Sequence, residues 1–311
     1  MRTFIRTHSV ATYFVLTFTI SWGLAFLAVG GADGMQGTTP ASDPRFAYAL
    51  MAMLAGPSLT GLLLTTLLSG RAGLRQYVSR LREWRVDVNS YIAAILIAPV
   101  GMIATLVALS LASPAFVPGI LTSDHTASVL LVGLAVGLSA GIFEESGWTG
   151  FAIPALRQRH GVLATGLIVG VWWSAWHLFP QIWASRAAAG NLTVPVYLAA
   201  TIAGVFVGYL TAFRVLMVWV YERTRSILVG MLMHVSFTAS LLILNPLNMS
   251  GANLQVYSFA LAAAIWLVAA AIFAGSGRLA RRGVFFDSHE LSPARAKEYT
   301  AAPALIEKLL H

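Results

Sequence analysis

Eight long apolar stretches divide this chain, and they constrain its fold more than any other feature of the sequence. Each contains about 20 residues, enough for a helix rising 1.5 Å per residue to cross ~30 Å of hydrocarbon. The stretches are residues 11–30, 46–69, 91–112, 127–150, 162–183, 198–221, 227–245 and 257–274. Because lipid cannot satisfy backbone polar groups, such stretches fold as helices. The sequence therefore predicts an all-α, polytopic membrane protein with about eight transmembrane helices.

The composition excludes the common soluble classes of protein. Charged residues make up 10% of the chain and hydrophobic residues 58%, whereas soluble domains carry roughly 25% charged residues. The net charge of +8 does not indicate a nucleic-acid partner, because the basic residues lie at the ends of the apolar stretches rather than in one patch. The absence of cysteine excludes disulfides, thiolate catalysis and cysteine-ligated metals. We therefore expect the lipid bilayer, and no nucleic acid, among the partners.

The distribution of arginine and lysine predicts the topology. Of the 20 basic residues, 17 fall in the terminal segments and the even-numbered connections, Arg45 and Arg186 fall in odd-numbered connections, and Arg214 lies inside a stretch. By the positive-inside rule, we expect a multi-pass protein of the cell (inner or plasma) membrane with both termini cytoplasmic. This topology requires stretch 11–30 to be retained, and its apolar core is longer than the ~7–15 residues of a signal peptide.

Short connectors join the stretches, so we expect one transmembrane helical domain at residues 1–277. Residues 71–87 place apolar side chains on one helical face and arginines mostly around the other, which predicts a helix lying along the cytoplasmic headgroups. Residues 278–311 are more polar and contain two prolines. We expect them to form a cytoplasmic tail with at most a short helix at 304–310.

Five charged or titratable side chains lie inside the apolar stretches: Glu144, Glu145, His177, Arg214 and His234. Ionisable groups are costly in a bilayer and usually face the bundle interior or a water-filled cavity. Either histidine alone would be explained by hydrogen-bonded packing, and the two carboxylates by a polar clamp between helices. Together, two carboxylates and two imidazoles are groups that move protons near neutral pH, so the set predicts a site inside the bundle.

Three short motifs surround these residues: FEESGWTGFAIP at 143–154, WWSAWHLFP at 172–180 and HVSFT at 234–238. They resemble the motifs of the CAAX prenyl protease and bacteriocin-processing family, also called the Abi family. Those motifs are two glutamates with an arginine four residues after the second, an aromatic residue and a histidine four apart, and a histidine followed four residues later by asparagine. The resemblance covers roughly residues 56–242, with a motif core at about 127–242.

The resemblance implies a role for each matching residue. Glu144 matches the glutamate that activates the hydrolytic water, assisted by His177. His234 and Thr238 match the pair that stabilises the oxyanion, and Glu145 matches the second glutamate, which pairs with the motif arginine. The implied function is that of an intramembrane endopeptidase that hydrolyses a peptide bond of a membrane-associated or lipidated protein substrate, without a cofactor.

Two positions depart from the family pattern. Thr149 stands in place of the arginine and cannot supply its charge to Glu145, an i,i+4 neighbour. Thr238 stands in place of asparagine, but its hydroxyl still offers a donor one turn from His234. Arg214 lies about seven residues from the end of its stretch and could replace the missing guanidinium opposite Glu145. Alternatively, its long stem could reach the headgroups.

Several alternatives remain open at this point. Loss of the motif arginine favours a non-catalytic family member that acts as a membrane binding, immunity or regulatory factor, and a proton-relaying transporter is a weaker alternative. Two histidines and a carboxylate could also hold zinc, although the H-E-x-x-H spacing is absent. Neither Ser146 nor Ser174 lies at a recognisable nucleophile elbow, which disfavours serine catalysis.

The depths of the two histidines differ when counted along their stretches. His177 lies about 15 residues, and His234 about seven, from the cytoplasmic ends, or ~22 Å against ~10 Å. We therefore expect the fifth helix to tilt or to start late. Pro154 could end the fourth helix early and leave the residues up to His160 along the interface.

Overall fold

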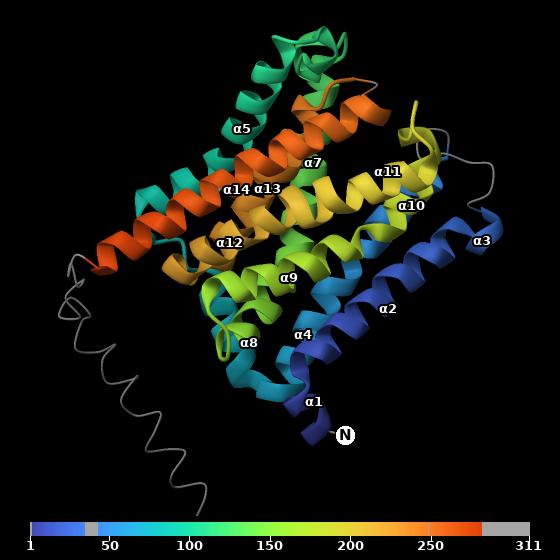
Figure 1. The fold of residues 1–311 in the computed structure, drawn as a ribbon. Coiled ribbons are helices and arrows are strands. Elements are labelled where there is room, and N and C mark those ends of the chain that lie inside the picture. The colour runs from blue at the N-terminus through green and yellow to red at the C-terminus, as the bar shows by residue number, and fades with distance from the viewer. Residues whose placement is uncertain (1, 35–42, 248, 282–311) are drawn as a thin grey trace, which may run out of the picture. The chain divides into compact units, whose positions relative to one another are not determined.

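The computed structural model describes residues 2–34, 43–247 and 249–281, and every regular element in these ranges is a helix (Figure 1). The longer helices are α2 (Ser9–Val29), α4 (Arg45–Leu81), α5 (Val88–Ser110), α7 (Thr126–Glu145), α9 (Val162–Trp176), α10 (Leu178–Ala188), α12 (Thr211–Thr224), α13 (Ile227–Leu244) and α14 (Gly251–Arg281). The shorter ones are α1 (Arg2–Thr7), α3 (Gly31–Gly34), the 3-10 turn η1 (Pro114–Phe116), α6 (Gly119–Thr122), α8 (Ile153–Arg157), α11 (Val194–Thr201), and the π-helical segments η2 (Trp148–Ala152) and η3 (Ile202–Leu210).

The chain divides into two units, Met1–Ala269 and Ala270–His311. Within the second unit, the structure describes only residues 270–281, which are the last part of α14. This helix continues beyond the end of the predicted eighth stretch. The predicted short helix at 304–310 lies outside the described residues.

Seven helical segments of the described chain are long and apolar enough to cross a membrane, and the pair α9 and α10, bent by 56°, adds an eighth if it counts as one span. The seven are α2, α4, α5, Thr126–Arg157, Val194–Thr224, α13 and Gly251–Gly275. The prediction of an all-α polytopic membrane protein with about eight spans is therefore confirmed. This is a multi-pass membrane protein.

The fifth predicted stretch is not one straight helix, because α9 ends at Trp176 and α10 starts at Leu178. Pro180 explains the break: a proline ring inside a helix clashes with the carbonyl four residues earlier, here that of Trp176. That carbonyl instead accepts a hydrogen bond of 2.9 Å from the indole Nε1 of Trp22 on α2. His177 therefore lies at the corner of a bent pair.

The fourth predicted stretch is not one regular helix either, although the helical segment Thr126–Arg157 extends beyond its predicted end. The α-helical part of α7 stops at Glu145, and the chain continues through η2 and α8. Pro154 does not cause this ending, because it lies in the first turn of α8, where a missing N–H costs nothing. Of the two alternatives expected for the fifth helix, a tilt or a late start, the late start does not occur, since α9 begins at Val162.

The predicted surface segment begins at a real break in the chain. Gly70 has φ 55° and ψ −145°, a conformation that glycine adopts without a Cβ clash, and it interrupts α4. Residues 71–81 then form a separate helical stretch that ends at Leu81, six residues short of the predicted boundary.

Candidate active site

Small residues on α7 let α13 approach closely. Glycines recur at every fourth position of α7, at residues 133, 137 and 141. A Cβ atom on Gly141 would lie 2.8 Å from the carbonyl oxygen of Met231 on α13. Membrane helices associate through such stripes because the backbones can come together without intervening side chains. The contact places the end of α7, with Glu144 and Glu145, beside His234.

A second pair of glycines brings α9 against α12. Gly166 and Gly170 face α12, and a Cβ atom on Gly166 would lie 2.6 Å from the Cα atom of Val215. This close packing joins Trp173 of α9 to Arg214 of α12. The guanidinium carbon of Arg214 lies 4.1 Å from the centroid of the Trp173 ring, within the range of a cation–π interaction.

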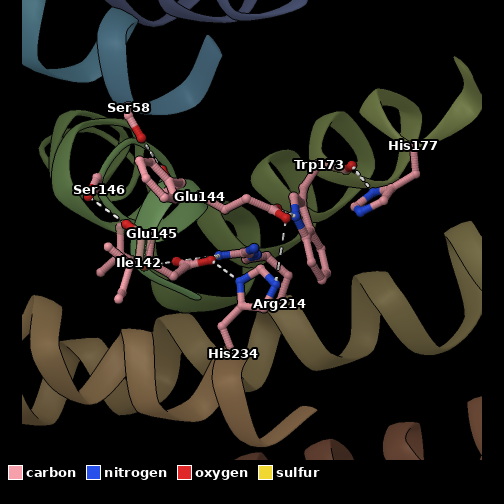
Figure 2. Close-up of polar contacts among 11 residues, drawn as sticks. Ser58, Ile142, Glu144, Glu145, Ser146, Trp173, His177, Arg214 and His234 are labelled. Atoms are coloured by element: carbon pink, nitrogen blue, oxygen red, sulfur yellow. Dashed lines mark hydrogen bonds and ion pairs between the residues drawn. The ribbon is translucent and has the colours of Figure 1, made fainter. Parts of the chain in front are cut away.

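Glu144 is held by one of its two oxygens. The side chain is buried, and its Oε2 atom accepts a hydrogen bond of 2.6 Å from the indole Nε1 of Trp173 (Figure 2). Its Oε1 atom lies 3.9 Å from Nε2 of His234, too far for a direct hydrogen bond. Two polar atoms at such a separation can share a bridging water. The carboxylate is thus oriented through Oε2, while Oε1 faces the second histidine.

Glu145 lies at the centre of a buried polar network. Nη1 of Arg214 lies 2.9 Å from Oε1 and 2.8 Å from Oε2 of Glu145, and both side chains are completely buried. His234 contributes a hydrogen bond of 2.6 Å from Nδ1 to Oε1, and the hydroxyl of Thr149 donates to Oε2. Figure 2 shows Glu145 pointing towards Arg214 and His234, and Glu144 pointing towards Trp173. Several donors thus compensate the carboxylate, as a buried charge requires.

The predicted position of Arg214 opposite Glu145 is therefore confirmed, and a side chain reaching the headgroups is wrong because Arg214 is fully buried. In the described part of the chain, Nε and Nη2 of Arg214 have no hydrogen-bond partner. The guanidinium also stacks on the Trp173 ring. Thr149 and Arg214 together occupy the two roles, hydrogen bond and charge, that one motif arginine would fill.

The two histidines lie on different edges of Trp173 (Figure 2). The ring centroids of His177 and His234 are 5.3 Å and 5.4 Å from that of Trp173, both in edge-on geometry. Nδ1 of His177 is 2.8 Å from the carbonyl oxygen of Trp173. Because a carbonyl only accepts, this nitrogen carries the proton, which leaves Nε2 of a neutral ring as an acceptor. The indole of Trp173 therefore lies beside both imidazole rings.

A cavity of about 390 Å³ joins these groups. Glu144, His177, His234 and Thr238 all line it, together with mostly apolar side chains such as Phe206. The structure therefore brings four of the five predicted site residues to one cavity. The fifth, Glu145, does not line the cavity but holds His234.

Trp173 is the residue whose importance the sequence analysis missed. It binds Glu144, stacks on Arg214 and contacts both histidine rings. The available signal was its place in the second motif, one helical turn before His177. The sequence analysis counted an aromatic residue there only as part of the family motif, but the indole of tryptophan also supplies an N–H donor.

The structure also bears on serine and metal chemistry. The hydroxyl of Ser146 donates to the carbonyl of Ile142 at 2.6 Å, and that of Ser174 to the carbonyl of Phe206 at 2.9 Å. Both hydroxyl protons are therefore engaged in hydrogen bonds to backbone carbonyls. Among the residues that the structure describes, no group of three or more histidine, aspartate or glutamate side chains is arranged to hold a metal ion.

The fold and site define a polytopic helical membrane protein with a buried glutamate and histidine cluster. Residues 126–240 match the family model of the type II CAAX prenyl endopeptidases, Rce1-like. CAAX prenyl protease 2 of Methanococcus maripaludis is 38% identical over 50 residues, which are 16% of this chain and 18% of that protein. The aligned segment thus spans less than a fifth of that relative. These findings confirm the resemblance to the CAAX protease family, and the matched residues extend from α7 into α13.

Proposed function

We propose that this protein is an intramembrane endopeptidase of the CAAX protease type, in which Glu144 activates water to hydrolyse a peptide bond of a membrane-associated protein. The observation that carries the proposal is the position of Glu144: it is buried, fixed by Trp173, and open to the same cavity as His177, His234 and Thr238. A general base must be close to the water that it deprotonates and held in orientation. The similarity of residues 126–240 to type II CAAX endopeptidases supports the same reaction class.

In the proposed mechanism, a water bound at Oε1 of Glu144 attacks the substrate carbonyl while the carboxylate takes its proton. Nε2 of His177 accepts a hydrogen bond that orients this water. Nε2 of His234 and the hydroxyl of Thr238 donate to the oxyanion that develops in the transition state. Because Nδ1 of His234 already donates to Glu145, donation from Nε2 requires the doubly protonated ring, and the two carboxylates of Glu144 and Glu145 then balance the charges of this ring and of Arg214. Glu144 then returns the proton to the leaving amine.

The apolar lining of the cavity favours a substrate segment with apolar side chains or an attached lipid. No metal ion enters the proposed reaction. Hydrolysis that is unaffected by chelators would support this part of the proposal, and loss of activity on chelation with recovery on adding zinc would contradict it.

The non-catalytic alternative rested mainly on the missing motif arginine. That argument loses its force, because Arg214 supplies a guanidinium to Glu145 from another helix. A scaffold that served only for binding would not require Glu144, His177 and His234 to share one cavity.

The test is a comparison of new protein termini in membranes of cells that produce the wild type or Glu144→Gln at matched levels. We expect a set of cleavages that appears with the wild type and disappears with Glu144→Gln. The control is Glu83→Gln, which removes the same charge in a connection far along the chain from the site, and should leave the cleavages intact. Identical profiles for wild type and Glu144→Gln would favour the non-catalytic factor.

We further propose that both termini lie on the cytoplasmic side of the cell membrane. This topology can be tested with single introduced cysteines, because the sequence contains no native cysteine. Single cysteines at the exposed positions Arg85 and Asp124 report on two successive connections. In intact cells, a membrane-impermeant maleimide should label Asp124→Cys and leave Arg85→Cys unlabelled until the membrane is opened. The reverse pattern would invert the proposed topology.

A further inference from the structure

Two adjoining cavities lie apart from the candidate active site, where α1, the start of α2, α8 and the break in α4 come together (Figure 1). Their volumes are about 470 Å³ and 440 Å³, and they share four lining residues, including Arg6 and Gln158. We call the two cavities the basic groove. Neither cavity is lined by Glu144, His177 or His234, so the groove is a site distinct from the candidate active site.

The lining of the basic groove is positively charged. Arg6 and Arg159 line the first cavity, and Arg6 and Arg80 line the second, while no acidic residue of the described ranges lines either. The guanidinium of Arg80 donates to the hydroxyl of Tyr221 at 2.9 Å and to the carbonyl of Gly150 at 3.0 Å. These neutral acceptors orient Arg80 without cancelling its charge. Arginines on two sides of one groove form a site for an anion.

The arginines in and near the groove differ in whether they form an ion pair. Arg157, two residues before Arg159, is paired with Glu222 at 2.8 Å. Arg6, by contrast, makes one long contact of 3.4 Å to the carbonyl oxygen of Leu68. Among the residues that the structure describes, the arginines that line the groove are therefore those without a carboxylate partner, whereas the adjacent Arg157 is paired with one.

One wall of the first cavity is apolar and open. Val15 is 64% exposed and Trp172 is 44% exposed, and the ring of Phe14 stacks on Trp172 with centroids 5.0 Å apart. All three residues line the same cavity as Arg6 and Arg159. The groove thus presents a cationic end beside an aromatic and aliphatic wall. A ligand that matches it carries an anionic head and an apolar chain.

We propose that the basic groove binds one anionic phospholipid, with the phosphate between Arg6 and Arg159 and an acyl chain along Val15 and Trp172. Basic pockets between membrane helices hold acidic headgroups because a phosphate accepts several charge-assisted hydrogen bonds and the chain remains in an apolar medium. The site does not depend on the proposed peptidase activity. A bound lipid would tie α1 and α2 to the segment after η2, and so brace the helix that carries Glu144.

The test uses the full-length protein in nanodiscs of phosphatidylcholine, with or without a minor fraction of phosphatidylglycerol. Lipid retained by the protein is measured by native mass spectrometry, and thermal unfolding is followed in parallel. The wild type should retain phosphatidylglycerol selectively and unfold at a higher temperature in its presence. The double variant Arg6→Gln/Arg159→Gln should bind it about 25-fold more weakly, since each basic side chain near a lipid headgroup is worth about fivefold.

The matched control is Arg71→Gln/Arg75→Gln, which removes the same charge from exposed arginines that do not line the groove. It should retain the lipid, as should Arg6→Lys/Arg159→Lys, which keeps the charge and shows that the groove still folds. Equal losses in the groove and control variants would overturn the proposal in favour of general surface attraction. Stabilisation by glycerol phosphate equal to that by the lipid would overturn it in favour of a site for a free anion.

Discussion

Arg214 and Glu145 form a fully buried ion pair between α12 and α7, in which one guanidinium nitrogen contacts both carboxylate oxygens at 2.9 Å and 2.8 Å. They lie 69 positions apart in the chain. The local pattern would have placed the positive charge one helical turn after Glu145, where Thr149 stands instead. The same electrostatic requirement is therefore met from a different helix.

Replacing Arg214 by leucine should destabilise the protein by about 3–5 kcal/mol, because it leaves the Glu145 charge buried without a cation. The double variant Glu145→Gln/Arg214→Leu should recover part of this loss, since no unpaired charge remains. Unfolding in a denaturant series in detergent measures both. If Arg214→Leu unfolds like the wild type and retains activity, Arg214 does not compensate for the motif arginine.

Replacing Trp173 by phenylalanine removes the indole N–H but keeps an aromatic ring beside Arg214 and the histidines. The lost hydrogen bond to the Glu144 carboxylate is worth about 1.5–3 kcal/mol, so we expect kcat to fall by about 10- to 100-fold with little change in KM. Phe237→Leu, a change in the packing of the same cavity, is the control and should affect KM more than kcat. An unchanged kcat for Trp173→Phe would show that the indole does not position the base.

Replacing Gly141 by alanine should separate α7 from α13. The new Cβ would lie 2.8 Å from the carbonyl oxygen of Met231, and backbone cannot move aside as a flexible side chain can. We expect a loss of about 1–3 kcal/mol in unfolding free energy, as for other overpacked sites, together with reduced peptidase activity because His234 moves with α13. Gly23→Ala is the matched control, since nothing lies within 4 Å of its added Cβ. Equal stabilities of the two variants would contradict the proposed close packing.

Asp87 caps the start of α5 and gives a dependence of stability on pH. Its carboxylate accepts hydrogen bonds from the Ser90 hydroxyl at 2.7 Å and the Ser90 backbone N–H at 3.0 Å. The hydroxyl contact is the main reason that the pKa of Asp87 is lowered. A lowered folded-state pKa means that the stabilisation is complete above the ordinary aspartate pKa of ~3.9 and is lost as the pH falls through the folded-state value.

At neutral pH, Asp87→Ala should therefore cost about 0.5–2 kcal/mol of unfolding free energy, and the difference from wild type should shrink below pH ~4. Asp87→Asn keeps an acceptor at the cap without a titrating group, and its stability should stay close to that of the wild type at neutral pH. Thermal unfolding measured across this range checks both. A difference between wild type and Asp87→Ala that does not change with pH would exclude titration of the cap.

The helical class and the approximate number of spans follow from the sequence because both are set by local physics. A run of about 20 apolar residues must form a helix wherever lipid surrounds it. The same reasoning singled out Glu144, Glu145, His177 and His234, since an ionisable group in an apolar stretch is energetically costly and usually has a functional role. Neither inference requires knowledge of which helices touch.

The breaks within helices were harder to predict. Pro180 interrupts the fifth span because its ring clashes with the turn before it. The bend at His177 leaves the carbonyl of Trp176 without a helical partner, and the indole N–H of Trp22 donates a hydrogen bond to it instead. Trp22 lies more than 150 positions away. The end of the regular α-helix α7 at Glu145 likewise lies beside a contact with α4, where Ser58 donates to the carbonyl of Phe143 at 2.5 Å.

The pairing of Arg214 with Glu145, and the position of Trp173 among Glu144, Arg214 and both histidines, were decided by tertiary structure. Hydropathy and motif spacing report on one helix at a time, whereas these contacts exist because glycines let α7 approach α13 and α9 approach α12. The sequence by itself determined which side chains would be costly in the bilayer. Only the packing of the helices decided how each cost is offset, because electrostatic and hydrogen-bond energies depend on distances of a few ångströms between groups far apart in the chain.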